Sequence, residues 1–340
     1  MEVVTDFDRL ESKLDAAEKA AAVSDNAFRQ SLASWYLSPA LVGQIPADPF
    51  SHEYETFQRE LYKRLANKEY DIVNEATDFD FDHSFLWPYP YSTKSAQTVG
   101  IHLMGYGWLI RKMNLPPESR ILEIGSGFGP LTVHLASMGY RVTCLDISEP
   151  LLDFVKARTA HLPQPVKTIC GDMATAELGG PYDAVIFNAS LHHSFEHREI
   201  VQRLDSILVA DGIVAFTAEP VVADNSRLLP YPWGIRLDGL GIWAVCKEGW
   251  LELGFQESYF IQVLNEAGWK LKRADLGISG QTDVWIGSRE GESASLSVEN
   301  STSRAYDVDL ETEVIRLRSL VEGYERGKFI RFMKWLNSST

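Results

Sequence analysis

The sequence of 340 residues predicts an α/β protein built on a doubly wound, mostly parallel sheet of seven strands. Between residues 116 and 290, short runs rich in β-branched residues alternate with amphipathic segments of helical spacing. That alternation is typical of βαβ units. A glycine-rich turn at 125–129 follows the first of these runs, and Asp146 ends the second. These three observations carry the fold prediction.

The predicted strands share Val, Ile, Leu and aromatic residues and are bounded by turn-forming residues. They are 120–124, 141–146, 165–170, 182–188, 212–218, 270–276 and 282–288. Helices are expected between them at 131–138, 149–160, 197–208 and 257–267. Gly139 and Gly268 each follow one of these helices, a place where glycine favours a left-handed helix end.

The predicted sheet domain occupies residues 115–290, and residues 1–114 precede it as a helical extension or lid. Helices are expected in the extension at 6–22, 52–70 and 92–114. Ser92 or Thr93 is expected to cap the last of these helices, because a hydroxyl can accept a hydrogen bond from a free backbone N–H there.

Two further segments lie outside the regular βα alternation. Residues 221–254 form a long insertion between the fifth predicted strand and the helix that follows it. Residues 291–310 are polar and are expected to be a linker, and 311–340 are expected to form an amphipathic C-terminal helix. Pairing of that helix with a second copy is the favoured role, and a partner protein or a membrane surface is an alternative.

Charge and composition exclude several classes of protein. The net charge is −15, and residues 1–90 hold 8 Lys/Arg against 17 Asp/Glu, so a nucleic-acid partner is not expected. No run approaches the roughly 18 apolar residues of a membrane span. The three cysteines are odd in number and lack a CxxC pair, which favours a reducing, cytoplasmic location over a disulfide framework or a zinc site.

The glycine-rich turn has the chemistry of a site for a nucleoside-containing ligand. Glycines let the backbone approach a ligand closely, and the helix that starts at Pro130 offers free N–H groups. Asp146 comes 17 residues after Gly129, where a carboxylate can accept hydrogen bonds from both hydroxyls of a ribose. Dinucleotide-binding turns need a small residue where this chain has Pro130, so a nicotinamide oxidoreductase is the least favoured enzyme class.

The run Glu123-Ile124-Gly125-Ser126-Gly127-Phe128-Gly129 resembles the first motif of the class I S-adenosylmethionine (SAM)-dependent methyltransferases, E/D-x-G-x-G-x-G. The resemblance implies a Rossmann-like fold, SAM as cofactor, and Asp146 on its ribose. The residues expected to bind the cofactor are Glu123, Gly125, Ser126, Gly127, Gly129, Asp146, Ile147, Asp172, Met173 and Asn188.

Later landmarks follow that family in order and spacing. Asp172 and Met173 follow the third predicted strand, where relatives contact the adenine. Asp183 begins the fourth strand and is expected to have a structural role. The run from Asn188 to His193 matches the N-x-x-L-H-H ending that is common in small-molecule methyltransferases.

Methyl transfer from SAM is an in-line displacement, so the protein mainly positions the acceptor and excludes water. A hydroxyl acceptor benefits from a base. His193 is the preferred candidate, with His192 and Glu219 as alternatives. The structural alternative is that both histidines only cap the next helix and pack. His193 and His197 also have metal-ligand spacing, but no third ligand is evident and no metal is expected.

The acceptor is expected to contact the aromatic residues of the insertion and of the segment before the third helix. Tyr89, Tyr91, Trp233 and Arg236 are the predicted contacts, and packing of the insertion on the sheet is the alternative. Residues 247–269 and the C-terminal helix look similar to methyltransferases of bacterial polysaccharide and glycan pathways. A hydroxyl of a sugar or glycan-linked acceptor is therefore the prediction. The alternatives are another small molecule (a natural product, lipid or quinone) and a SAM-binding scaffold without turnover.

Overall fold

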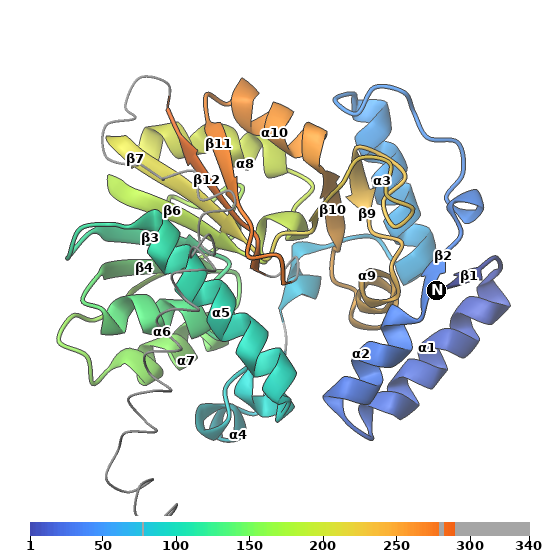
Figure 1. The fold of residues 1–340 in the computed structure, drawn as a ribbon, viewed down its shortest axis with the longest axis horizontal. Helices are drawn as coiled ribbons and strands as arrows, with labels where there is room; N and C mark the ends of the chain where they lie inside the picture. The colour runs from blue at the N-terminus through green and yellow to red at the C-terminus, as the bar shows by residue number, and fades with distance from the viewer. Residues whose placement is uncertain (77, 279–281, 290–340) are drawn as a thin grey trace, which may run out of the picture. The chain divides into compact units, whose positions relative to one another are not determined.

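The computed structural model describes residues 1–76, 78–278 and 282–289 (Figure 1). The predicted linker, 291–310, and the predicted C-terminal helix, 311–340, lie outside the described residues, so their expected roles stay predictions.

The central sheet has seven strands in the order β11-β12-β7-β6-β3-β4-β5. In chain order they are β3 (Arg120–Ile124), β4 (Arg141–Asp146), β5 (Lys167–Cys170), β6 (Tyr182–Asn188), β7 (Leu208–Thr217), β11 (Lys270–Ala274) and β12 (Val284–Ser288). The strands from β3 to β7 are parallel, and β12 runs antiparallel to both β7 and β11. This confirms the predicted Rossmann-like, doubly wound sheet.

Helices pack on the sheet, and Leu122, Val185 and Phe216 in its central strands are fully buried. They are α5 (Ala96–Met113), α6 (Pro130–Ser137), α7 (Glu149–Thr159), α8 (His197–Arg203) and α10 (Glu257–Glu266). Helix α5 packs on β7 and β12, whereas α6 and α7 pack on β4. Gly139 and Gly268 have φ of +88° and +87°, as their places after α6 and α10 predict.

The N-terminal region contains more elements than the sequence predicted. Helices α1 (Phe7–Ala21) and α3 (His52–Ala66) were expected, but α2 (Asp25–Ala33) and α4 (Phe81–Leu86) were not. The other N-terminal elements are β1 (Glu2–Val4), β2 (Trp35–Leu37) and three 3₁₀ turns, η1 (Pro39–Leu41), η2 (Ile72–Glu75) and η3 (Tyr91–Thr93).

The predicted cap of α5 is wrong by two or three residues. Ser95, rather than Ser92 or Thr93, accepts the hydrogen bond from the Thr98 N–H at 3.2 Å. Residues 91–93 form η3 instead, and the Thr93 hydroxyl donates to the Pro90 carbonyl. Several hydroxyl residues precede this helix, so composition alone could not select the cap.

The insertion forms a small sheet and packs on α3 (Figure 1). Its elements are β8 (Val221–Val222), β9 (Trp233–Ile235), α9 (Gly239–Trp243), the π-helical turn η6 (Ala244–Glu248) and β10 (Leu253–Gln256), with strand order β8-β10-β9. The Gln58 side chain is fully buried and bonds the Trp233 carbonyl and the Ile235 N–H. Tyr54 donates to the same carbonyl at 2.7 Å, and Tyr62 donates to the Gly249 carbonyl at 2.5 Å.

Candidate active site

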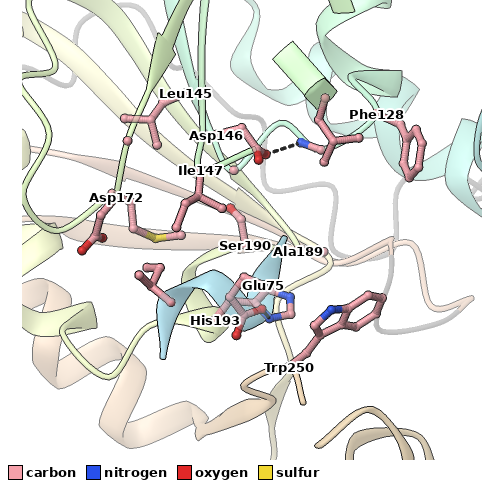
Figure 2. A pocket seen from close by; sticks show the side chains of 16 residues that line it. Glu75, Phe128, Leu145, Asp146, Ile147, Asp172, Ala189, Ser190, His193 and Trp250 are labelled. Atoms are coloured by element: carbon pink, nitrogen blue, oxygen red, sulfur yellow. Dashed lines mark hydrogen bonds and ion pairs between the residues drawn. The ribbon is translucent and has the colours of Figure 1, made fainter. Parts of the chain in front are cut away.

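A cavity of about 210 Å³ opens at the carboxyl ends of the parallel strands (Figure 2). The loops after β3, β4, β5 and β6 line one side of it. Turn η2 and Trp250, from the insertion, line the other side. Doubly wound sheets bind ligands at this edge, because the loops at the carboxyl ends of their strands converge there.

The three glycines of the first loop have different reasons to be glycine. All have positive φ, at +71° for Gly125, +52° for Gly127 and +63° for Gly129. A β-carbon on Gly125 would lie 2.5 Å from the Ser190 β-carbon, and one on Gly129 would lie 2.5 Å from a Val155 methyl group. A β-carbon on Gly127 would meet nothing within 4 Å, although Gly127 lines the cavity. Gly127 therefore leaves room for a ligand, whereas the other two glycines leave room for the protein.

The Asp146 carboxylate lies in the cavity at the end of β4 and is held by backbone donors (Figure 2). One oxygen accepts the Gly127 N–H at 2.7 Å, and the other accepts the Ser148 N–H at 2.9 Å. Burial raises the pKa of Asp146, although these N–H groups act in the opposite direction. Each oxygen keeps a second lone pair, so the carboxylate can still accept hydrogen bonds from a ligand's hydroxyls.

Glu123 lies behind the glycine loop and does not line the cavity. Its side chain is fully buried, and Thr132 donates to one oxygen at 2.5 Å. The other oxygen has no hydrogen-bond partner among the described residues, and neither does the buried Ser126 hydroxyl. Burial raises the pKa of Glu123 to about 8, and the nearby charge of Asp146 adds to this rise. Two orphaned polar atoms therefore remain beside the loop.

The other residues that were predicted to bind the cofactor fall into two groups, those that line the cavity and those that do not. Ile147, Asp172 and Met173 line the cavity, whereas Gly129 and Asn188 do not. The Asp172 carboxylate accepts the Ala174 N–H at 2.8 Å, which holds the turn after β5.

Asp183 has the structural role that was expected. It accepts the Arg120 backbone N–H at 2.6 Å and pairs with the Arg120 guanidinium at 3.0 Å. This pairing lowers the pKa of Asp183 and joins the starts of β3 and β6.

Glu219 holds the turn that follows β6, η4 (Leu191–His193). One oxygen accepts the N–H groups of Ser190 and Leu191, and the other accepts the His192 N–H and lies 2.7 Å from His192 Nδ1. Burial acts to raise the pKa of Glu219, but His192 and the backbone donors outweigh it and lower the pKa. Neither Glu219 nor His192 lines the cavity. Both predicted alternatives to His193 therefore face the protein interior.

His193 lines the cavity beside Glu75 and Trp250 (Figure 2). Its Nδ1 lies 3.1 Å from Glu75 Oε2, but at an angle that does not qualify as a hydrogen bond. Burial acts to lower the pKa of His193. The nearby carboxylates of Glu75, Glu252 and Glu219 outweigh burial and raise the pKa to about 9. The surrounding carboxylates therefore favour the protonated form of the His193 ring in the free protein.

The four predicted acceptor contacts do not line the cavity. Trp233 is 3% exposed, and its indole N–H donates to the Pro49 carbonyl. Arg236 pairs with Glu252 at 2.5 Å. The Tyr89 hydroxyl lies 2.9 Å from His102 Nε2, and Tyr91 is partly exposed elsewhere. Trp233 and Arg236 are therefore engaged in contacts within the protein.

Sequence reasoning missed Glu75 entirely and did not single out Trp250 among the aromatic residues of the insertion. Glu75 sits in η2, a single 3₁₀ turn within an acidic stretch, and gave no periodic signal. Its relation to His193 depends on contacts between residues more than a hundred positions apart.

A metal site is not assigned. Within the described ranges, ligand atoms of His192, His193 and Glu252 lie within 4.8 Å of one another. However, the Arg236 guanidinium already contacts Glu252 Oε2, so a cation there would face a fixed positive charge. His197 is buried with Nε2 2.9 Å from the Tyr259 hydroxyl, so its spacing from His193 does not create a shared site.

The sheet order, the glycine loop and the carboxylate on the second parallel strand define a Rossmann-like cofactor-binding domain. Residues 121–212 match the family described as "Methyltransferase domain". The chain therefore carries a class I, SAM-dependent methyltransferase domain, and SAM is the cofactor of that domain. The glycine loop and the Asp146 carboxylate, here called the cofactor cradle, fit SAM, because Gly127 leaves open space beside the buried Asp146 carboxylate.

Curated relatives match this domain rather than the whole chain. An uncharacterized methyltransferase of Mycobacterium tuberculosis is 35% identical over 96 residues, which is 28% of this chain and 48% of the relative. The putative methyltransferase YqeM of Bacillus subtilis is 30% identical over 136 residues, which is 35% of this chain and 55% of the relative. The chain thus spans about half the length of these relatives.

Among the solved structures that are similar to this chain is a 1,6-didemethyltoxoflavin-N1-methyltransferase of Burkholderia thailandensis. It is 17% identical with a TM-score of 0.46, and the match covers 73% of this chain and 92% of that one. No helix in the described part of the chain has the length and apolar content that a membrane span requires.

Proposed function

We propose that this protein transfers a methyl group from SAM to a hydroxyl of a small, uncharged acceptor, of which a sugar or glycan-linked hydroxyl is the leading class. The observation that carries the proposal is one cavity that joins the cofactor cradle at Gly127 and Asp146 to His193. Bound SAM supplies a methyl group on a positively charged sulfonium. The residues of this chain then have to hold the cofactor, orient the acceptor and accept its proton.

The cofactor-holding residues follow from the lining of the cavity. Asp146 accepts hydrogen bonds from the ribose, and Asp172 and Met173 lie at the end expected for the adenine. Glu123 and Ser126, whose orphaned atoms lie beside the loop, support the cradle from behind.

His193 is the proposed proton acceptor. It is the histidine that lines the cavity, and a hydroxyl needs a base more than an amine does. Because its pKa is about 9 in the free protein, the basic form becomes more populated as pH rises toward 9. The rate with a hydroxyl acceptor is therefore expected to rise over the same range.

The acceptor class is inferred from the cavity wall. The charged side chains that line it are Glu75, Asp146, Asp172 and His193, and no Lys or Arg lies among the lining residues that the structure describes. An anionic group beside the reacting atom would face carboxylates. Trp250 offers an aromatic face, and Glu75 can accept hydrogen bonds, which suits a sugar ring. A polysaccharide pathway and a cytoplasmic location stay expectations that accompany this acceptor class.

The cofactor part of the proposal is tested by Asp146→Ala. Loss of two charge-assisted hydrogen bonds to the ribose is expected to weaken SAM binding by roughly 100-fold. Isothermal calorimetry measures this, with Asp205→Ala as the control, because Asp205 is exposed and pairs with Arg289 outside the cavity. Equal affinity in wild type and Asp146→Ala would contradict the proposed cradle.

The acceptor part is tested by His193→Asn with methyl-labelled SAM and a panel of neutral saccharides. The expected result is transfer by the wild type and a loss of about 10²- to 10⁴-fold in kcat for the variant. Affinity for SAM should stay within about threefold in the variant, since Asp146 and Gly127 are untouched. His161→Asn, at an exposed site, is the control. Wild-type transfer to none of the saccharides would contradict the sugar class, and an unchanged kcat would remove His193 from the chemistry.

A further inference from the structure

We propose that Glu75, from the N-terminal segment, is a positioning residue that holds His193 in the orientation of a proton acceptor. The inference rests on the proposed function and adds to it a residue outside the methyltransferase domain match, which covers 121–212.

The geometry is that of a carboxylate–imidazole pair at the cavity wall. Glu75 Oε2 lies 3.1 Å from His193 Nδ1, and the Glu75 side chain is only 12% exposed. Figure 2 shows the two side chains next to each other. A carboxylate on Nδ1 favours the tautomer that leaves the lone pair on Nε2, which is the form that can accept a proton from a hydroxyl.

Glu75 is itself fixed on its other side. Its Oε1 accepts the Leu251 N–H at 2.7 Å, next to Trp250. Tyr70, five residues earlier, donates its hydroxyl to the His193 carbonyl at 3.2 Å. Residues 70–75 therefore hold His193 through both its ring and its backbone, and the same carboxylate joins the segment to the insertion.

Several charged groups face His193 from other elements. Glu252 precedes β10, Glu219 follows β7, and Asp146 ends β4, and all three favour the charged imidazole. His192 packs against the His193 ring at 4.2 Å between centroids, and burial and the His193 charge lower the pKa of His192. Arg236 is neutralised by Glu252 and Asp238. Among these groups, Glu75 makes the closest charged contact with the ring and also lines the cavity.

The inference can be tested without acceptor or cofactor, by NMR of the full-length chain labelled with ¹³C and ¹⁵N in its histidines. His193→Asn assigns the His193 signal among the eight histidines. In wild type the ring is expected to titrate near pH 9 and to show the Nδ1–H tautomer above that pH. Glu75→Gln should lower the midpoint by about one pH unit or more, because the nearest negative charge is gone. Glu75→Asp should retain part of the raised midpoint.

Glu69→Gln is the matched control, since Glu69 lies in the same segment but pairs with Lys63 at the surface. Its His193 midpoint should equal that of the wild type. An unchanged midpoint in Glu75→Gln, or a wild-type ring in the Nε2–H tautomer, would overturn the inference. The tautomer is read in the wild-type sample once His193→Asn has assigned the signal, so this part of the test does not depend on the Glu75 variants folding. SAM calorimetry on the same samples separates the two failures: absent SAM binding overturns the proposed function, whereas an uncoupled His193 overturns only the role of Glu75.

Discussion

Replacing Gly127 with Arg is expected to abolish SAM binding while leaving the protein folded. A β-carbon at this position would meet no protein atom within 4 Å, and Gly127 lines the cavity, so we expect the arginine side chain to extend into the cavity instead of displacing the core. The positive φ of +52° adds about 1–2 kcal/mol of backbone strain. We expect the affinity for SAM, measured by calorimetry, to fall by more than about 100-fold, or about 2.8 kcal/mol.

Gly139→Arg is a closely matched control for this variant. Gly139 also has positive φ, at +88°, and open space where a β-carbon would lie, but it ends α6 and does not line the cavity. Thermal unfolding should show a similar loss of stability in both variants, with SAM affinity retained in Gly139→Arg. Tight SAM binding by Gly127→Arg would mean that the cofactor lies elsewhere.

Glu219→Ala is expected to be the most destabilising single change in the site. The carboxylate is fully buried and accepts three backbone N–H groups and the His192 ring. Its removal leaves these donors unpaired in the interior, at a cost of at least about 3 kcal/mol. Urea unfolding followed by circular dichroism measures the loss.

The comparison for Glu219 is Glu196→Ala. Glu196 is part-exposed and pairs with Arg59 at 2.7 Å, so its loss should cost under about 1 kcal/mol. If the two variants were equally stable, Glu219 would not be the anchor of the turn after β6. His193, which belongs to that turn, would then be held mainly from the side of Glu75.

The sheet could be predicted because its signals are local. The bounds of β3, β4 and β6 agree with the predicted 120–124, 141–146 and 182–188, since each strand is a buried apolar run bounded by polar or turn residues. The glycine loop was equally readable, because Gly125 and Gly129 are required by close contacts that only glycine permits. Helices α2 and α4 were missed because both are short, at 9 and 6 residues, which leaves a helical pattern little length in which to repeat.

The acceptor side could not be predicted to the same extent. The insertion contains several tryptophans, and composition does not say which one faces a cavity. Trp233 lies in the interior, where Tyr54 and His197 pack on its ring, whereas Trp250 lines the cavity. Glu75 depends on the approach of η2 to the turn after β6, a long-range contact that no local pattern encodes.

The hydrogen bonds of Gln58, Tyr54 and Tyr62 make the insertion depend on helix α3. A chimera that imports a foreign 221–254 segment alone would strand these polar groups without partners. Helix α3 and the insertion should therefore be exchanged as one cassette. Because the insertion contributes only backbone groups to these bonds, Gln58, Tyr54 and Tyr62 should be retained even where the side chains of the insertion change.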